Sequence, residues 1–189
     1  MSAQDSKLFV ISGPSGAGKG TLVTRVRERR SNLGLTVSAT TRAPRKGEVD
    51  GVNYFFLTRE EFDRRVANGE FVEWAEVHGN CYGTLVSEVT SKLASGSSLI
   101  LEIDVQGALQ VKERFPEAVL IFIKPPSLEV LRERLFGRGT ETPETIELRM
   151  ANAADELALA DRYDDVVVND DLDRATDELV RVLDMHERI

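Results

Sequence analysis

The segment GPSGAGKGT, residues 13–21, has the residue types and spacing of a loop that binds phosphate. Its glycines allow several backbone N–H groups to converge on one anion at the start of a helix, where the helix dipole favours negative charge. Lys19 adds an ammonium group. The complete motif, G-x-x-x-x-G-K-[ST], continues with a hydroxyl that ligates Mg²⁺, but Gly20 occupies that position. The pattern therefore leaves open a working loop with a weaker metal site, a loop without catalysis, or a plain glycine-rich turn.

A second group of residues suited to an anion lies in TTRAPR, where Arg42 and Arg45 stand in a loop that contains proline. Arginines placed this way grip an anion through paired N–H bonds. Residues 25–46 hold seven basic and one acidic side chains, although the whole chain has a net charge of −8. This charge argues against a protein that coats nucleic acid, and the basic zone indicates a small anionic ligand. A solvated helix face is the alternative for the arginines at 25–30.

Four continuous apolar runs are typical of parallel strands that are covered on both faces. These runs are residues 7–12, 97–104, 118–124 and 164–169. Helical patterns lie between them, with N-caps expected at Asp104, Ser127 and Thr142. The sequence therefore predicts an α/β protein, a three-layer fold with a largely parallel central sheet. The middle, roughly 34–96, favours strands around one short helix from about Arg59, and we expect an inserted mixed β module there.

The composition excludes several other classes of protein. The single cysteine, Cys81, rules out an intrachain disulfide, and two histidines without a cysteine cluster make a structural zinc site improbable. No apolar run has the length of a membrane span, and the N-terminus lacks the layout of a secretion signal. We expect a cytoplasmic protein with no membrane association.

Residues 36–57, TVSATTRAPRKGEVDGVNYFFL, closely resemble guanylate kinase. The likeness continues through FVEWAEVHGNCYGT (71–84), LEIDVQGA (101–108), RLFGRGTE (134–141) and VVVNDDL (166–172). The family transfers the terminal phosphoryl group of ATP to GMP on a P-loop kinase fold with a GMP-binding insertion and a mobile helical lid. The resemblance implies Mg²⁺ held mainly by ATP phosphates and water, with no metal ligand from the chain. It also implies ATP and GMP as substrates, and no nucleic acid, membrane or obligate protein partner.

The same resemblance divides the chain into five segments. They are the core with the phosphate loop (1–33), the GMP-binding insertion (34–96), further core (97–130), the lid region (131–161) and the C-terminal core strand and helix (162–189).

The resemblance also assigns residues to roles. ATP binding falls to Gly13, Pro14, Ser15, Gly16, Ala17, Gly18, Lys19, Gly20, Thr21 and Asn169. GMP binding falls to Ser38, Arg42, Arg45, Tyr54, Glu73, Tyr82, Thr84, Glu102 and Asp104. Catalytic charge stabilisation falls to Lys19, Arg42, Arg134, Arg138 and Arg149, with Gly137 and Gly139 giving the lid freedom to move.

The chemistry of guanine supports the choice of carboxylates for base recognition. Guanine offers two donors, N1–H and the 2-amino group, so Glu73 and Glu102 can accept what adenine cannot donate at N1. Alternatives remain for single residues: Tyr54 and Tyr82 as core aromatics, the lid arginines as a solvated face, Asp104 as a helix cap. Asn169 could likewise cap the final helix.

Two rival functions share the fold. An inert guanylate-kinase-like module that binds a protein would be expected to lose Lys19 and the lid arginines, which are present. A kinase for another nucleoside monophosphate conflicts with the pair Glu73 and Glu102. Adenylate kinases also carry GAGKGT, so Gly20 bears on Mg²⁺ affinity rather than on the type of reaction.

Overall fold

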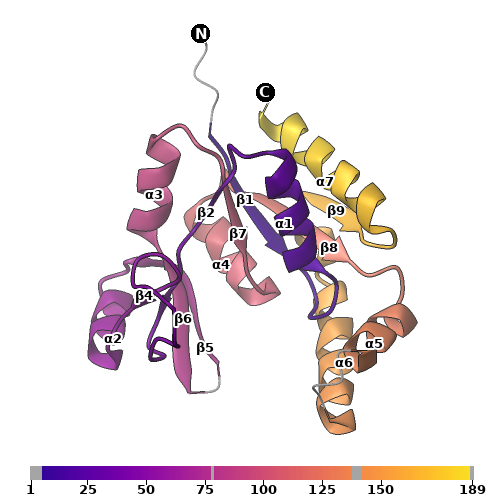
Figure 1. Ribbon diagram of the computed structural model, residues 1–189, viewed down its shortest axis with the longest axis horizontal. Coiled ribbons are helices and arrows are strands. Elements are labelled where there is room, and N and C mark those ends of the chain that lie inside the picture. Colours follow the sequence, from indigo (N-terminus) through magenta and orange to yellow (C-terminus); the bar gives the residue numbers. More distant parts are fainter. Residues whose placement is uncertain (1–5, 78, 138–141, 188–189) are drawn as a thin grey trace.

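The core of the protein is a five-stranded parallel sheet, seen in a computed structural model that describes residues 6–77, 79–137 and 142–187 (Figure 1). The strand order is β2-β7-β1-β8-β9. The strands are β1 (Leu8–Ser12), β2 (Gly34–Leu35), β7 (Leu99–Glu102), β8 (Val119–Lys124) and β9 (Asp165–Val168). All four neighbouring pairs are parallel.

Helices cover both faces of this sheet because its strands are apolar on both sides. On one face, Phe9 and Ile11 pack with α1 (Lys19–Arg29) and α7 (Leu172–Glu187). On the other, Leu8 and Val10 pack with α3 (Val86–Ala94) and α4 (Val105–Arg114). Alternate side chains of β1 thus pack into two separate hydrophobic cores, one on each face of the sheet. The predicted three-layer α/β fold is confirmed.

A second sheet, with mixed strand directions, lies beside the core. Its order is β4 (Phe55–Phe56), β3 (Ala39–Thr40), β6 (Asn80–Leu85) and β5 (Phe71–Val77). The helix α2 (Arg59–Ala67) covers it, and the Phe62 ring stacks on Phe71 with centroids 4.3 Å apart. The predicted β module and its helix from Arg59 are therefore present.

The segment 34–96 also contains two elements of the core. β2 pairs with β7 in the parallel sheet, and α3 packs on that sheet through the buried Val89. The expectation of a single helix in this segment was wrong, because α3 is present as well. Its valines and Thr90 favour strands by themselves, and burial of one face stabilises the helix instead.

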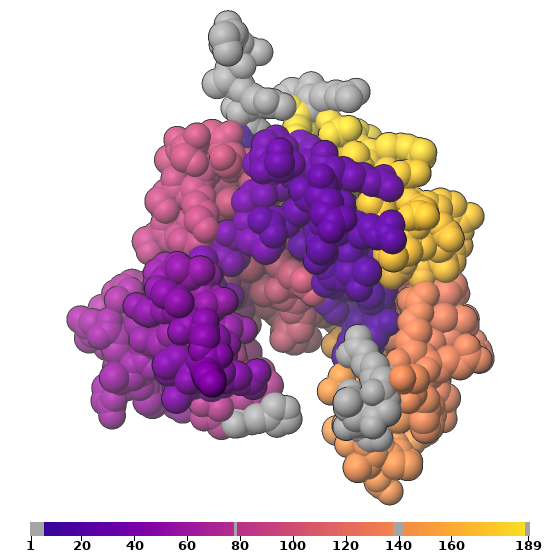
Figure 2. Space-filling view, in the orientation of Figure 1, coloured from indigo at the N-terminus to yellow at the C-terminus, as the bar shows by residue number. Residues whose placement is uncertain are grey.

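The last two helices before β9, α5 (Leu128–Gly137) and α6 (Pro143–Leu157), pack on each other through Leu131, Leu135, Ile146 and Ala153. A short 3₁₀ turn (Ala160–Arg162) follows. Figure 2 shows that the molecule is hollowed between this helix pair and the second sheet. Among the residues that the structure describes, no helix is long and apolar enough to span a bilayer.

The three predicted N-caps are confirmed. Asp104 Oδ1 accepts from the Gly107 N–H at 2.7 Å, Ser127 Oγ accepts from Val130 at 3.2 Å, and Thr142 Oγ1 accepts from Thr145 at 3.3 Å. These local bonds satisfy N–H groups that the helix itself leaves unpaired.

Candidate active site

The turn between β1 and α1 has the backbone of an anion-binding loop. Gly13, Gly16 and Gly18 all have positive φ, at 139°, 90° and 91°. A Cβ on Gly13 would lie 2.3 Å from the Ile123 carbonyl oxygen, so only glycine allows the loop to approach β8 this closely. No side chain caps α1 and no acidic residue stands in its first turn. The start of α1 therefore has the electrostatic character that favours an anion.

Two side chains set the loop in place. Lys19 Nζ folds back along the loop and lies 2.5 Å from the Gly13 oxygen and 3.1 Å from the Pro14 oxygen. Asn169, at the end of β9, donates from Nδ2 to the Ala17 oxygen at 2.7 Å. The alternative that Asn169 caps the final helix is not realised, because Asp171 accepts the Arg174 N–H there at 2.9 Å. The expected contact of Asn169 with adenine stays a prediction.

Two of the three arginines that we assign to catalysis from the lid, Arg134 and Arg149, reach the neighbourhood of this loop. Arg134, on α5, donates to the Asn169 oxygen at 2.9 Å, and Arg149, on α6, donates to Ser15 Oγ at 2.7 Å. Two helices thus bring cationic groups to one loop. Arg138 and Gly139 lie outside the described residues.

Carboxyl groups gather around Lys19. A Cβ added to Gly20 would lie 3.6 and 3.7 Å from the two oxygens of Glu102, an ordinary contact distance. Glu102 is exposed, yet the neighbouring protein displaces enough water to raise its pKa, and Lys19 lowers it. Burial also raises the pKa of Glu156, on α6, with Lys19 opposing this shift and Asp104 adding to it.

Glu73 is the most deeply buried carboxyl group of the site, with 8% of its surface exposed. The β5–β6 register shifts between Phe71 and Glu73, and Phe71, Val72 and Glu73 are buried in succession. This bulge breaks the alternation of the strand and turns Glu73 inward. Glu73 pairs across the strands with Thr84.

The surroundings of Glu73 favour its protonated form. Burial raises its pKa, the charge of Asp104 raises it further, and the polar groups of Thr84 lower it. Thr84 Oγ1 is buried, with no well-aligned hydrogen bond to any described residue. A Cβ on Gly107 would lie 3.3 Å from Glu73 Oε2 and 3.4 Å from Asp104 Oδ1. Asp104 is therefore both a helix cap and a close neighbour of Glu73.

The loop between β3 and β4 carries the second set of cationic residues. Arg42 makes a bidentate ion pair with Glu48, and its guanidinium carbon lies 5.4 Å from the centroid of the Tyr54 ring. Tyr54 packs edge-on against Tyr82, with centroids 6.2 Å apart. Arg45 is exposed. Ser38 is half-buried and accepts a backbone bond from Phe55.

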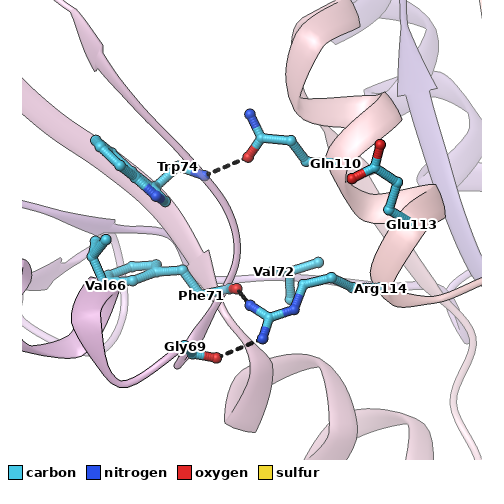
Figure 3. A pocket seen from close by; sticks show the side chains of 8 residues that line it. All are labelled: Val66, Gly69, Phe71, Val72, Trp74, Gln110, Glu113 and Arg114. Atoms are coloured by element: carbon cyan, nitrogen blue, oxygen red, sulfur yellow. Dashed lines mark hydrogen bonds between the residues drawn. The ribbon is translucent and has the colours of Figure 1, made fainter.

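Helix α4 fastens the strand that carries Glu73. Arg114 donates to the carbonyl oxygens of Phe71 and of Gly69, the latter at 2.8 Å, and the Trp74 N–H donates to Gln110 at 3.4 Å (Figure 3). A cavity of about 210 Å³ lies between these side chains. The position of Glu73 is thus set from the core sheet rather than by the second sheet alone.

The arginines at 25–30 that pair with α7 do not belong to the site. Arg25, Arg29 and Arg30 pair with acidic residues of α7, namely Asp173, Asp177, Asp184 and Glu187. The solvated helix face holds for Arg25 and Arg29, whose side chains are 42% exposed, whereas Arg30 follows α1 and is 12% exposed in its pair with Glu187. Arg42, Arg45 and Lys46 remain as the basic residues of the loop after β3.

Sequence reasoning missed two residues of the site. Glu48 stands six positions after Arg42, a spacing that would have suggested a partner only if the turn geometry were known. Glu156 belongs to no motif, and only the packing of α6 brings it to Lys19.

The whole chain is similar to known enzymes. A family model described as guanylate kinase matches residues 5–186. The guanylate kinase of Gloeobacter violaceus is 57% identical over 178 residues, 94% of this chain and 87% of that protein. The guanylate kinase of Halalkalibacterium halodurans is 51% identical over 183 residues, 97% and 90% of the respective chains. The crystal structure of guanylate kinase from Anaplasma phagocytophilum matches with a TM-score of 0.74 and 36% identity, over 97% of this chain and 87% of that one.

Proposed function

We propose that this protein transfers the γ-phosphoryl group of Mg²⁺-bound ATP directly to GMP. The premise is that the chain belongs to the guanylate kinase family and is therefore an ATP:GMP phosphotransferase. The products are ADP and GDP. The observation that carries this proposal is the buried Glu73, which the bulge in β5 turns inward and which lies beside Asp104 and Thr84.

ATP is assigned to the loop before α1. The N–H groups at the start of α1 and the Lys19 ammonium suit its β- and γ-phosphates. Arg134 and Arg149 come from the two lid helices and can neutralise charge on the transferred group. Arg138 is assigned the same role from its sequence.

GMP is assigned to the second sheet. Its phosphate would meet Arg42 and Arg45, with the hydroxyls of Tyr54 and Tyr82 beside them. Its base would meet Glu73, whose carboxylate accepts from N1–H and the 2-amino group. The remaining residues with a proposed role at the base are Ser38, Thr84, Glu102 and Asp104.

The residues present fit Mg²⁺ held mainly by ATP. Glu102 and Asp104 offer carboxylate oxygens, the ligand type that Mg²⁺ prefers, and could bind its water molecules. Within the described ranges, no three His, Cys, Asp or Glu side chains are grouped to hold a metal by themselves. The ion would neutralise charge on the phosphates of ATP.

The reaction needs no nucleophile from the protein. A phosphate oxygen of GMP attacks the γ-phosphorus of ATP while the bond from that phosphorus to the β–γ bridging oxygen breaks. The chain contributes binding, alignment and positive charge around the transferred group, which together supply most of the rate enhancement in phosphoryl transfer.

Replacing the carboxylate by an amide tests the assignment of Glu73. We expect Glu73→Gln to lower the preference for GMP over AMP, as a ratio of kcat/KM, by about tenfold or more, because the amide no longer offers two acceptors. Glu76→Gln is the matched control, since Glu76 is half-exposed on the same strand and pairs with Arg59. An unchanged preference in Glu73→Gln would remove Glu73 from base recognition.

A further inference from the structure

The loop that carries Arg42 contains a carboxylate that holds the arginine from one side. Arg42 Nη1 lies 3.0 Å from Glu48 Oε2, and Arg42 Nη2 lies 2.9 Å from Glu48 Oε1. The same Oε2 accepts the backbone N–H of Arg45 at 2.6 Å. One side chain therefore contacts both residues to which the GMP phosphate is assigned.

This pair differs from the other ion pairs of the second sheet in its burial. The side chains of Arg42 and Glu48 are 16% and 20% exposed, whereas those of Arg59 and Asp63 are 53% and 56% exposed. The rings of Tyr54 and Phe56 lie under the guanidinium, 5.4 and 5.9 Å from its central carbon. Because the bond is bidentate and enclosed, it fixes the plane of the guanidinium, which an exposed single contact would not do.

Both partners stay charged across the neutral range. The hydrogen bond to Glu48 raises the pKa of Arg42, and the hydrogen bond from Arg42, followed by that from Arg45, lowers the pKa of Glu48.

The donors of Arg42 divide into two sets. A guanidinium has five N–H donors. The two N–H donors of Nη1 bind the Ala43 oxygen, at 2.7 Å, and Glu48. One N–H donor of Nη2 also binds Glu48. The Nε–H and the second Nη2–H are not needed for these contacts. They form the other long edge of the guanidinium, which matches two oxygens of a phosphate group.

The turn after Arg45 brings Glu48 into reach. The Glu48 N–H donates to the Arg45 oxygen at 3.0 Å, and Gly47 has φ 89°, a conformation that favours glycine. This turn and the Arg45 N–H therefore hold the Glu48 carboxylate in place beside Arg42.

We propose that Glu48 is a positioning residue: the Arg45 N–H fixes its carboxylate, and the carboxylate holds Arg42 by one edge so that the other edge of Arg42 receives the phosphate of GMP. The proposal rests on the proposed function of this loop. It predicts that Glu48 acts on GMP through Arg42 and has no separate contact with the nucleotide.

The test measures GMP and ATP affinity by calorimetry in Glu48→Gln, with Glu61→Gln as the matched control. Glu61 lies in the same module and also pairs with two arginines, Arg64 and Arg65. We expect the Kd of GMP to rise about tenfold in Glu48→Gln, and the KM of GMP to rise with it, while kcat falls less. The Kd of ATP should stay within about twofold of the wild type, which also shows that the variant is folded. Glu61→Gln should match the wild type.

A double-mutant cycle separates a role through Arg42 from a general structural role. In an Arg42→Ala background, Glu48→Gln should change the Kd of GMP less than about twofold. An equal effect in both backgrounds would overturn the proposal, as would unchanged or tighter GMP binding in Glu48→Gln, since tighter binding would make Glu48 a competitor of phosphate. If the wild type itself bound no GMP, the proposed function would fail first.

Discussion

Four carboxyl groups surround the reaction centre that we assign, and they differ in their environment. Glu73 is buried beside Asp104, whereas Glu102 and Glu156 lie near Lys19. The pKa values of Glu73, Glu102 and Glu156 are all raised, primarily by loss of hydration. Carboxyl groups of this kind lower the stability of the protein without ligand. A ligand that donates hydrogen bonds to them compensates for the lost hydration.

The pH dependence of stability should show how much the buried carboxylate of Glu73 destabilises the folded protein. A raised pKa means that the folded state binds the proton more tightly than the unfolded state does. The free energy of unfolding therefore falls as the pH rises from the ordinary pKa of 4.5 to the folded value, and the loss persists above it. We expect Glu73→Gln to melt at a higher temperature than the wild type near pH 7, with the difference shrinking toward about pH 4. Thermal unfolding between these values checks this, and a lower melting temperature in Glu73→Gln at neutral pH would contradict it.

The open position at Gly20 should accept a hydroxyl. A Cβ at this position would make only ordinary contacts with Glu102, so Gly20→Ser should change the free energy of unfolding by less than about 1 kcal/mol. The added hydroxyl is a ligand for Mg²⁺, so the Mg²⁺ concentration for half-maximal turnover should fall several-fold. Gly20→Ala adds the same Cβ without the oxygen and should keep the wild-type requirement. If Gly20→Ser and Gly20→Ala required the same Mg²⁺ concentration, the added hydroxyl would not be a ligand for Mg²⁺.

At the scale of elements, the phosphate loop depends on the approach of β1 to β8. Gly13→Ala would add a Cβ against the Ile123 carbonyl at a position with positive φ, so it should cost about 3 kcal/mol or more of stability. Gly96 also has positive φ, 84°, but a Cβ there would have nothing within 4 Å, so Gly96→Ala should cost only about 1 kcal/mol. Chemical denaturation of both variants gives the comparison. Equal losses would mean that backbone conformation alone, without the contact to β8, requires Gly13.

Elements whose signals are local could be predicted from the sequence. Asp104 and Thr142 cap their helices through bonds to residues three positions on, and the apolar runs form the strands of the core sheet. The phosphate loop with Lys19 and the anion-binding arginines Arg42 and Arg45 were also predicted from their local pattern. The roles of the tyrosines and glutamates came from the family resemblance, because such residues taken singly carry no signal.

Features that depend on contacts between distant segments could not be predicted. The pairing of β2 with β7 joins residues about 65 positions apart, and the bulge that turns Glu73 inward exists only against β6. The helix α3 forms against the preference of its β-branched residues because Val89 is buried on the core sheet. Glu48 and Glu156 could not be predicted for the same reason: their place at the site depends on contacts that form only when the chain folds.

At the scale of the whole molecule, the N-terminal and C-terminal helices are joined by ion pairs of very different burial. The side chains of Arg30 and Glu187 are 12% and 5% exposed, whereas those of Arg25 and Asp173 are 42% and 73% exposed. Arg30→Ala would leave a buried carboxylate without its partner and should cost about 2–4 kcal/mol. Arg25→Ala should cost less than about 1 kcal/mol. Urea denaturation of the two variants tests this ranking, and equal losses would contradict it.

The assigned residues come from three parts of the molecule: the core sheet, the second sheet and the pair α5–α6, with a hollow between the last two (Figure 2). Lys19 belongs to the first part, Arg42 and Glu73 to the second, Arg149 to the third. No single part holds all of the residues to which we assign a role.

The most direct measurement is ADP formation from ATP with GMP, AMP, CMP and UMP in turn, as the Mg²⁺ concentration is varied. We predict turnover that depends on Mg²⁺ and is confined to guanine nucleotides, because Glu73 accepts hydrogen bonds that the other bases do not offer in this pattern. Turnover of another monophosphate at a comparable rate would contradict the proposed base recognition. Folded protein that turned over no acceptor at saturating Mg²⁺ would contradict the catalytic function itself.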